Sequence, residues 1–402
     1  MEDRVRALYK NRIFRNIILA ALTILAGLSV YQGIRNARTF SQDFQWDAAR
    51  ALMLGIDPYR ESLEPTGALL DGNLKDYYSY YESIGAPQKM EANQFPSLLM
   101  LLYPWAALAP SSARLVWLIT NLLFTAGIVV LLRLTFLKDC DRFVFTVLVL
   151  LLLAGTPYRN QLGVGQHTLF SLFFFLLAVW LCEKKYCSIP SALCLAVGLF
   201  KYTLTAPLAL WFVYKRKWRE LLTACGIHLA LTAVAALWLG EKLPDMIIMP
   251  LKVSSALASE GGLDFGALFG GSPVAFVLAG LVFALLFVLA LFADEKSENA
   301  LMAVLLLWSL IMLYHRTYDF FVLILVAGMF TGDAKETYGK DKILLTGFVV
   351  LLPLVFFVLR LFHENAASRI AVGALYYAYT VYATVRLIKY TGFGKHEITG
   401  KA

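Results

Sequence analysis

The sequence predicts an all-α protein that crosses a membrane many times, and its composition and its apolar runs are the reasons. Hydrophobic residues make up 59% of the 402 residues and charged residues only 16%, whereas soluble domains carry about 25% charged residues. Runs of about 20 apolar residues, the length that crosses a bilayer, recur along the whole chain. A water-soluble domain could not bury this much apolar surface, so the composition argues against a secreted, a free cytosolic or a nucleic-acid-binding protein.

Basic residues determine the predicted orientation. The net charge is +8, and a basic excess in a membrane protein mostly reflects cytoplasmic loops rich in Lys and Arg, so no polyanionic partner is needed. Four basic residues precede the first apolar run, residues 14–34, a fifth, Arg15, lies at its start, and no small-residue cleavage site follows it. This run is therefore predicted to be a retained first span whose N-terminal end lies inside.

Residues 35–92 form the only long hydrophilic stretch, and they are predicted to lie outside after the first span. Loops longer than about 15 residues are usually functional in compact proteins, so this stretch is expected to be the catalytic or binding loop. Within it, Gly55 followed by Pro58 is a helix stop signal, which predicts a short helix at about 44–54.

That short helix carries charged residues along one polar edge, because Asp43, Asp47 and Arg50 fall at positions i, i+4 and i+7. The apolar residues of the same helix could lie on the membrane surface, where an acid at the end of the first span could meet a lipid headgroup. The alternative is a solvated amphipathic helix with a capping Asp.

The remaining spans are predicted to follow in a single membrane domain of residues 1–402, giving about a dozen in total. The expected spans and half-spans are 95–109, 112–135, 143–156, 167–182, 188–213, 219–240, 272–292, 299–313, 317–331, 342–362 and 368–389. The segments near 241–271, 314–317 and 363–367 are then expected outside, and residues 390–402 form a cytoplasmic tail.

Four basic residues decide the topology of the middle of the chain: Lys138, Arg142, Lys184 and Lys185. Placing them inside, as the positive-inside rule favours, requires that 95–109 does not cross and that 188–213 forms two half-helices meeting at Lys201. Placing them outside would allow simple crossings instead.

Charges inside apolar runs are costly and therefore mark functional candidates. Lys201 interrupts such a run, and inserting a Lys at mid-membrane costs roughly 2.5–3.5 kcal/mol, so its side chain is expected to face a cavity that holds an anion. The alternative is a Lys that snorkels from the end of a half-helix.

A second polar cluster lies between two apolar stretches and contains His315, Arg316 and Asp319. It could clamp a phosphate, with Arg316 supplying a planar fork of donors, or it could be an outer turn closed by an Arg–Asp pair. Arg159, upstream of Gln166 and His167, could join the same site.

Several motifs occur in order over about residues 40–320. They are Asp43-Phe44 with Trp46, Ala49, Gly55 and Asp57-Pro58-Tyr59; Asn93-Gln94-Phe95-Pro96-Ser97; Gly165-Gln166-His167; Gly198-Leu199-Phe200-Lys201; and Gly270-Gly271-Ser272-Pro273. Together they resemble glycosyltransferase family 87, which contains polyprenyl-phosphate-mannose-dependent mannosyltransferases of the GT-C membrane fold. Ser97 stands where the family usually has a second Pro, and His167 stands where Asn is commoner, so the resemblance does not carry over the identity of the sugar.

The resemblance implies a function and a site. It implies a GT-C enzyme that transfers a hexose, with inversion, from a polyprenyl-phosphate donor to a hydroxyl of a glycolipid or glycan on the outer face of a bacterial plasma membrane. Asp43 would be the general base, without a metal or other cofactor. The expected substrate-binding residues are Asp47, Arg50, Arg159, Gln166, His167, Lys201, His315, Arg316 and Asp319, and among them Lys201, His315 and Arg316 would hold the phosphate.

Two alternatives stay open at this point. A transporter or flippase of a lipid-linked sugar would use the same charges as binding groups without chemistry, but no repeated halves are visible in the sequence. A non-catalytic subunit of a glycan-assembly complex would tolerate substitution of Asp43.

The Asp139-Cys140-Asp141 stretch has the form of a D-x-D metal motif, but its basic neighbours favour a solvated charge run. The five Cys are expected to be free thiols.

Overall fold

The computed structural model describes residues 11–41, 43–64, 74–184, 187–257, 262–269, 272–294, 297–331, 345–351 and 366–390. Regular structure in these residues is entirely helical. Five helical stretches are long and apolar enough to cross a membrane: α2 (Arg12–Phe40), α8 (Pro110–Leu134), the run Ser188–Tyr214, α14 (Trp218–Leu239) and α17 (Pro273–Phe292). The bent pair α9 (Arg142–Ala154) and α10 (Thr156–Val164) would be a sixth. The prediction of a helical membrane protein is confirmed. The number of about a dozen spans and the GT-C fold remain predictions.

Seven more described helices pack beside these, and all of them except α22, which has 25 residues, are shorter than the spans. They are α11 (Thr168–Cys182), α15 (Leu243–Leu257), α16 (Phe265–Phe269), α18 (Glu298–Met312), η4 (Thr317–Val322), α19 (Leu323–Thr331) and α22 (Ala366–Tyr390). The central helix is α18, in which nearly every side chain is buried. The segment 299–313, which was predicted to be a span, is thus part of the protein core, and the helix has only 15 residues.

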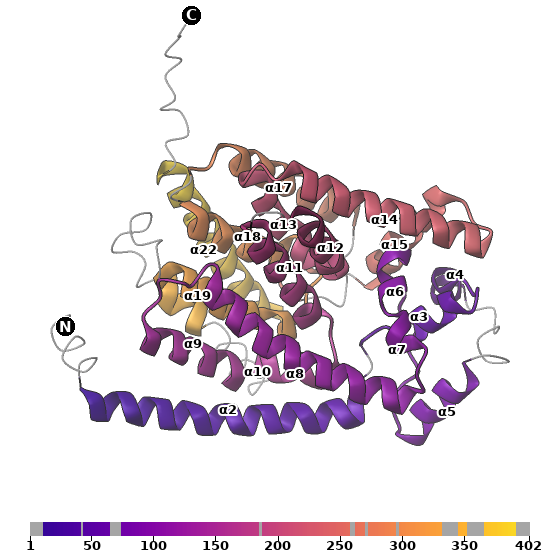
Figure 1. Ribbon diagram of the computed structural model, residues 1–402, viewed down its shortest axis with the longest axis horizontal. Helices are drawn as coiled ribbons and strands as arrows, with labels where there is room; N and C mark the ends of the chain where they lie inside the picture. The colour runs from indigo at the N-terminus through magenta and orange to yellow at the C-terminus, as the bar shows by residue number, and fades with distance from the viewer. Residues whose placement is uncertain are drawn as a thin grey trace, which may run out of the picture.

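The predicted outer loop, 35–92, and the predicted half-span, 95–109, fold together into a cluster of short helices. These are α3 (Trp46–Met53), α4 (Pro58–Leu63), α5 (Lys75–Ser83), α6 (Pro96–Leu101) and α7 (Tyr103–Ala106), which together are called the loop module. They gather at the end of the molecule where α2 finishes, at the right of Figure 1. The module packs around a second apolar cluster, distinct from the main one, to which the long helices also contribute, for example through Trp117 of α8 and Ala236 of α14.

The short helix predicted at 44–54 is confirmed as α3, and Gly55, with φ +79°, ends it. Its environment differs from the prediction: α3 is not a helix on the membrane surface but is buried on most faces by the rest of the loop module. The tyrosines of α5 complete this core, since Tyr77 stacks on Trp46 with ring centroids 4.6 Å apart. Tyr77, Tyr78 and Tyr81 are all buried in it.

The predicted break at Lys201 is confirmed. The segment consists of α12 (Ser188–Gly198), the 3₁₀ turn η1 (Leu199–Lys201) and α13 (Tyr202–Tyr214). Phe175 of α11 contacts both arms: its backbone lies against Gly198, and its ring centroid is 6.4 Å from that of Phe212. Lys201 has ψ 68°, outside the helical region, so the helical path is interrupted at this residue.

The segment 241–271, expected as an outer connection, contains two helices, α15 and α16. The apolar run of α15 is too short to have been predicted as a span. Of the predicted span 342–362, only residues 345–351 are described, and the tail 391–402 lies outside the described residues.

The close approach of α11 and α12 gives a first prediction. A Cβ at Gly198 would lie 2.8 Å from the backbone nitrogen of Phe175, so Gly198→Ala forces the two helices apart and is expected to destabilise by about 1–3 kcal/mol. The matched control is Gly226→Ala on α14, where nothing lies within 4 Å of the added methyl group. Thermal unfolding in detergent should show a lower Tm for Gly198→Ala and an unchanged or slightly higher one for Gly226→Ala; equal values would contradict this packing.

Candidate active site

A cavity of about 350 Å³ lies between the loop module and the long helices. One part of its wall is polar and comes from the loop before α3, from the segment 89–94, and from the residues around Lys201 and Tyr318. The other part is apolar and comes mainly from α17, through Ala275, Phe276, Ala279 and Phe283. The cavity can therefore hold a molecule with a polar head and an apolar tail.

Asp43 lines this cavity because the chain turns sharply after α2. The Asp43 backbone N–H donates to the Val164 carbonyl at 3.1 Å, and the Ser41 hydroxyl donates to the same oxygen at 3.3 Å. Gly165, with φ +76°, makes this contact possible, since a Cβ there would lie 2.2 Å from Ser41 Oγ. The glycine of the Gly165-Gln166-His167 motif thus lets the end of α10 meet the end of α2.

A buried arginine on α8 fixes the same turn. Arg114 donates to the carbonyls of Arg38, Thr39 and Ser41, the last at 2.7 Å. These carbonyls have no partner inside α2 because they lie in its last turn or just beyond it, and a cation there also interacts favourably with the helix dipole. The backbone around Asp43 is held from two sides.

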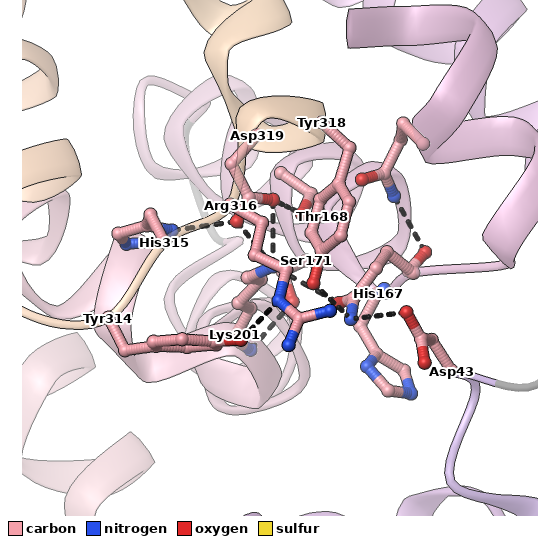
Figure 2. A network of polar contacts seen from close by, with 12 residues as sticks. Asp43, His167, Thr168, Ser171, Lys201, Tyr314, His315, Arg316, Tyr318 and Asp319 are labelled. Carbon is pink, nitrogen blue, oxygen red and sulfur yellow. Dashed lines mark hydrogen bonds and ion pairs between the residues drawn. The ribbon is translucent and has the colours of Figure 1, made fainter. Parts of the chain in front are cut away.

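The opposite polar wall is a buried network centred on Asp319 (Figure 2). Lys201 Nζ lies 2.7 and 2.8 Å from the two Asp319 carboxylate oxygens. His315 Nδ1 is 2.8 Å from Oδ2, and Thr168 Oγ1 donates to Oδ1 at 2.5 Å. Asp319 therefore joins η4, the start of α11 and the break between α12 and α13.

Gln166 connects this network to Asp43. Its Oε1 accepts from Lys201 Nζ at 3.1 Å, while its Nε2 donates to Tyr318 Oη at 2.8 Å and to Asp43 Oδ2 at 3.4 Å. The long contact leaves the Asp43 carboxylate with lone pairs that a ligand can use. Arg316 also lines the cavity, and its Nε donates to the Tyr314 hydroxyl.

The structure thus brings together most of the residues singled out in the sequence, namely Asp43, Gln166, His167, Lys201, His315, Arg316 and Asp319. All but His315 line the cavity, and His315 lies directly behind Asp319. His167 is buried against the rings of Trp117 and Phe200, at centroid distances of 5.6 and 4.5 Å.

Besides His315, three more of the expected site residues do not line the cavity: Asp47, Arg50 and Arg159. Asp47 is 2% exposed inside the loop module. Arg50 Nη1 donates to the Ala106 carbonyl of α7 at 3.3 Å, and Arg159 Nη1 donates to Gln32 Oε1 of α2 at 2.9 Å. The contacts of Arg50 and Arg159 join neighbouring helices, whereas Asp47 is enclosed within the loop module.

Several polar residues line the cavity without having been predicted from the sequence: Gln45, Lys89, Glu91, Asn93, Gln94, Tyr202, Ser254, Tyr314 and Tyr318. Asn93 and Gln94 belong to a recognised motif, but the motif alone suggested no role for them. For Lys89 and Glu91 the only available signal was their place in the long polar stretch.

The second acidic residue of the D-x-D stretch, Asp141, has a structural role. Its side chain caps α9 by accepting hydrogen bonds from the N–H groups of Phe143 and Val144. Within the described part of the chain, no three His, Cys, Asp or Glu side chains lie close enough together to hold a metal ion.

A family model, that of glycosyltransferase family 87, matches residues 96–315, more than half of the chain. The chain belongs to glycosyltransferase family 87. No curated protein and no solved structure matches it. The family match includes Gln166, His167, Lys201 and His315; Asp43 lies before it, and Arg316 and Asp319 lie just after it. A glycosyltransferase of this family needs a sugar donor and an acceptor, and the membrane-spanning helices place it in a membrane.

The buried ion pair gives the second prediction. Removing one partner of a buried pair leaves an uncompensated charge and typically costs about 3–5 kcal/mol, so Lys201→Met and Asp319→Asn should each lower the Tm strongly. The double variant Lys201→Met/Asp319→Asn removes both charges and should be more stable than either single variant. Thermal unfolding in detergent measures this cycle; strictly additive losses would contradict the pairing.

The third prediction concerns pH. Burial raises the pKa of the Asp47 carboxyl to about 7 from an ordinary value of 3.8. The folded state therefore holds a proton that the unfolded chain releases, so this contribution to stability is complete below about pH 4 and is lost as the pH rises through about 7. Asp47→Asn cannot ionise, so its Tm relative to the wild type should increase from about pH 4 to about pH 8. A Tm difference that stays constant over this range would contradict the assignment.

Proposed function

We propose that this family 87 glycosyltransferase transfers a hexose, mannose or a similar sugar, from a polyprenyl-phosphate donor to a hydroxyl of a glycolipid or glycan. The reaction takes place on the outer face of a bacterial plasma membrane, and Asp43 is the general base. The observation that carries the proposal is that one cavity is lined by the Asp43 carboxylate, the Arg316 guanidinium and the apolar residues of α17. These three features match an acceptor hydroxyl, a phosphate and a lipid chain.

In the proposed reaction Asp43 accepts the proton of the acceptor hydroxyl while that oxygen attacks the anomeric carbon. The bond between this carbon and the phosphate oxygen breaks, and the polyprenyl phosphate leaves with the electron pair, so the anomeric configuration is inverted. General-base help of this kind is typically worth about 10²–10⁴-fold in rate. Gln166 helps to orient the base, because its Nε2 donates to Asp43 Oδ2.

Arg316 is the proposed main contact of the leaving phosphate, since a guanidinium offers two parallel N–H donors to phosphate oxygens. Lys201 also lines the cavity, but its charge is balanced by Asp319 at 2.7 Å. In the proposal Lys201 therefore contributes a polarised N–H and the position of Gln166 more than a net charge. His315 does not contact the phosphate in this proposal; it positions Asp319, with which it shares a hydrogen bond.

The apolar wall is the proposed contact for the first isoprene units of the carrier. Ala279 and Gly280 are small and lie next to Phe276 and Phe283 along α17, a helix whose other faces are largely exposed in the isolated chain and thus available to lipid. A chain leaving the cavity past these residues would reach the bilayer directly.

The fourth prediction tests the base. Purified protein in nanodiscs is given a panel of short polyprenyl-phosphate hexoses and a lipid extract as acceptor, with EDTA present, and transfer is scored by mass spectrometry. Wild type should transfer one of the sugars. Asp43→Asn should lose about 10²-fold or more in rate with little change in donor KM, since the substitution removes the base but not the phosphate contacts.

The matched control is Asp57→Asn in the same loop module. Asp57 caps α4 by accepting from the N–H groups of Tyr59 and Arg60, a role that Asn fills equally well, so this variant should transfer at the wild-type rate. Equal activity of Asp43→Asn and wild type would remove Asp43 from the mechanism. Donor binding without transfer to any acceptor would favour a transporter instead.

A further inference from the structure

Tyr318 carries a hydroxyl proton that none of the described residues accepts. Its side chain lines the cavity, and among the described residues Gln166 alone makes a hydrogen bond to its hydroxyl group. In that contact Gln166 Nε2 donates to Tyr318 Oη at 2.8 Å. The hydroxyl oxygen is therefore an acceptor here, and its own proton is available to a ligand in the cavity.

The direction of this hydrogen bond follows from the other contacts of Gln166. Its Oε1 accepts from Lys201 Nζ at 3.1 Å and from the His167 backbone N–H at 3.4 Å. Both of these groups donate, since the Lys201 ammonium is paired with the Asp319 carboxylate and has no lone pair. The amide oxygen of Gln166 must therefore face Lys201, and its NH₂ group must face Tyr318.

The Tyr318 hydroxyl lies close to both the proposed base and the proposed phosphate contact. Gln166 Nε2 also donates to Asp43 Oδ2 at 3.4 Å, so the hydroxyl and the Asp43 carboxylate flank one amide group. Arg316 precedes Tyr318 by two residues and lies within electrostatic range of Tyr318 and Asp43. Figure 2 shows the Tyr318 ring directing its hydroxyl toward the middle of the network. A ligand that meets both Asp43 and Arg316 therefore comes within reach of this hydroxyl.

The surroundings favour a phosphate oxygen as the acceptor of the Tyr318 proton. Hydrogen bonds in which the acceptor is ionised are roughly twice as strong as those between neutral groups. The Arg316 guanidinium attracts an anion to the part of the wall to which Tyr318 belongs. A sugar hydroxyl is neutral and gains no such advantage there, so the phosphate of the donor is the better partner.

We propose that the Tyr318 hydroxyl donates a hydrogen bond to the phosphate of the polyprenyl-phosphate donor and that this bond strengthens in the transition state. The proposal rests on the function proposed above. The phosphate carries one negative charge in the donor and two after it leaves, so a fixed hydrogen-bond donor stabilises the transition state more than the bound substrate. The proton stays on the tyrosine throughout, because a phenol has an ordinary pKa of about 10 and the leaving phosphate one of about 6.

The test uses the leaving group alone, so that binding is measured apart from sugar transfer. Farnesyl phosphate is titrated into the full-length protein in nanodiscs at about pH 8, where the phosphate is a dianion. Binding is measured by isothermal titration calorimetry, with protein-free nanodiscs as the blank. Tyr318→Phe should weaken binding about tenfold or more, the loss expected for one hydrogen bond to a charged group. Farnesol, which lacks the phosphate, should bind equally to the wild type and the variant.

A matched control and a kinetic measurement accompany this titration. Tyr158→Phe removes another buried hydroxyl, which contacts Thr125 Oγ1 at 3.0 Å and does not line the cavity, so this variant should bind farnesyl phosphate like wild type. In the transfer assay, Tyr318→Phe should lower kcat about 10- to 100-fold with a smaller change in donor KM, because the hydrogen bond is strongest in the transition state. The substitution keeps the ring in place, and thermal unfolding checks that the variant is folded.

The outcomes separate this proposal from the proposed function. Loss of transfer with unchanged binding of farnesyl phosphate would mean that Tyr318 acts only through Gln166 and Asp43, and it would overturn the phosphate contact. Unchanged binding with unchanged transfer, or an equal loss of farnesol binding, would overturn it as well. Weaker binding of farnesyl phosphate to Tyr318→Phe, in a protein that transfers sugar from none of the donors, would overturn the proposed function and leave the phosphate contact standing.

Discussion

The ion pair between Lys201 and Asp319 is the contact on which the geometry of the site depends. Its two residues and their partner Thr168 come from three places where a helix starts or breaks, the η1 turn, η4 and the start of α11. A lone Lys at this depth would be costly, and Asp319 supplies the compensating charge. Such a pair adds little net stability compared with apolar packing, but it fixes the relative position of these elements and, through Gln166, of Asp43.

The loop module is attached to this frame by a different set of contacts. Arg114 binds the last carbonyls of α2, Tyr81 Oη donates to the Ser41 carbonyl at 3.3 Å, and Asp43 itself pairs with Val164. The proposed base therefore lies at a backbone position that is held from α8, α5 and α10. Preorganisation of this kind is what general-base catalysis requires, because the carboxylate must be within hydrogen-bond reach of the reacting proton.

Sequence reasoning recovered the features that depend on local chemistry. Composition and apolar runs predicted the helical membrane protein, Gly55 predicted the end of α3, and the basic loops predicted the break at Lys201. The same reasoning placed Asp47 and Arg50 on an exposed polar edge and expected them to bind substrate. Periodicity shows which residues share one face of a helix, but it does not show which other elements cover that face. Burial by α5, α6 and α7 is a tertiary effect that spacing along the chain does not reveal. Gln45 and Gln94 were missed for a related reason, because spacing along the chain does not show which polar residues line a cavity.

The ion pair shows a second limit of sequence reasoning. Lys201 was expected to face an anion, and Asp319 was expected in a separate polar cluster much later in the chain. Each was recognised as unusual on its own, but no rule of spacing joins two such charges. The structure supplies this connection, and with it the reason why Arg316, more than Lys201, is the cation proposed to contact a phosphate.

The most direct test of the central claim, a single displacement with Asp43 as base, is the anomeric configuration of the product. The donor is a polyprenyl-phosphate hexose of defined configuration, and the glycosidic bond in the product is assigned by the one-bond C1–H1 coupling in NMR spectra. The proposed mechanism requires inversion at the anomeric carbon. Retention would mean two successive displacements through a covalent or ion-pair intermediate, and it would contradict the role of Asp43 as the base of a single displacement.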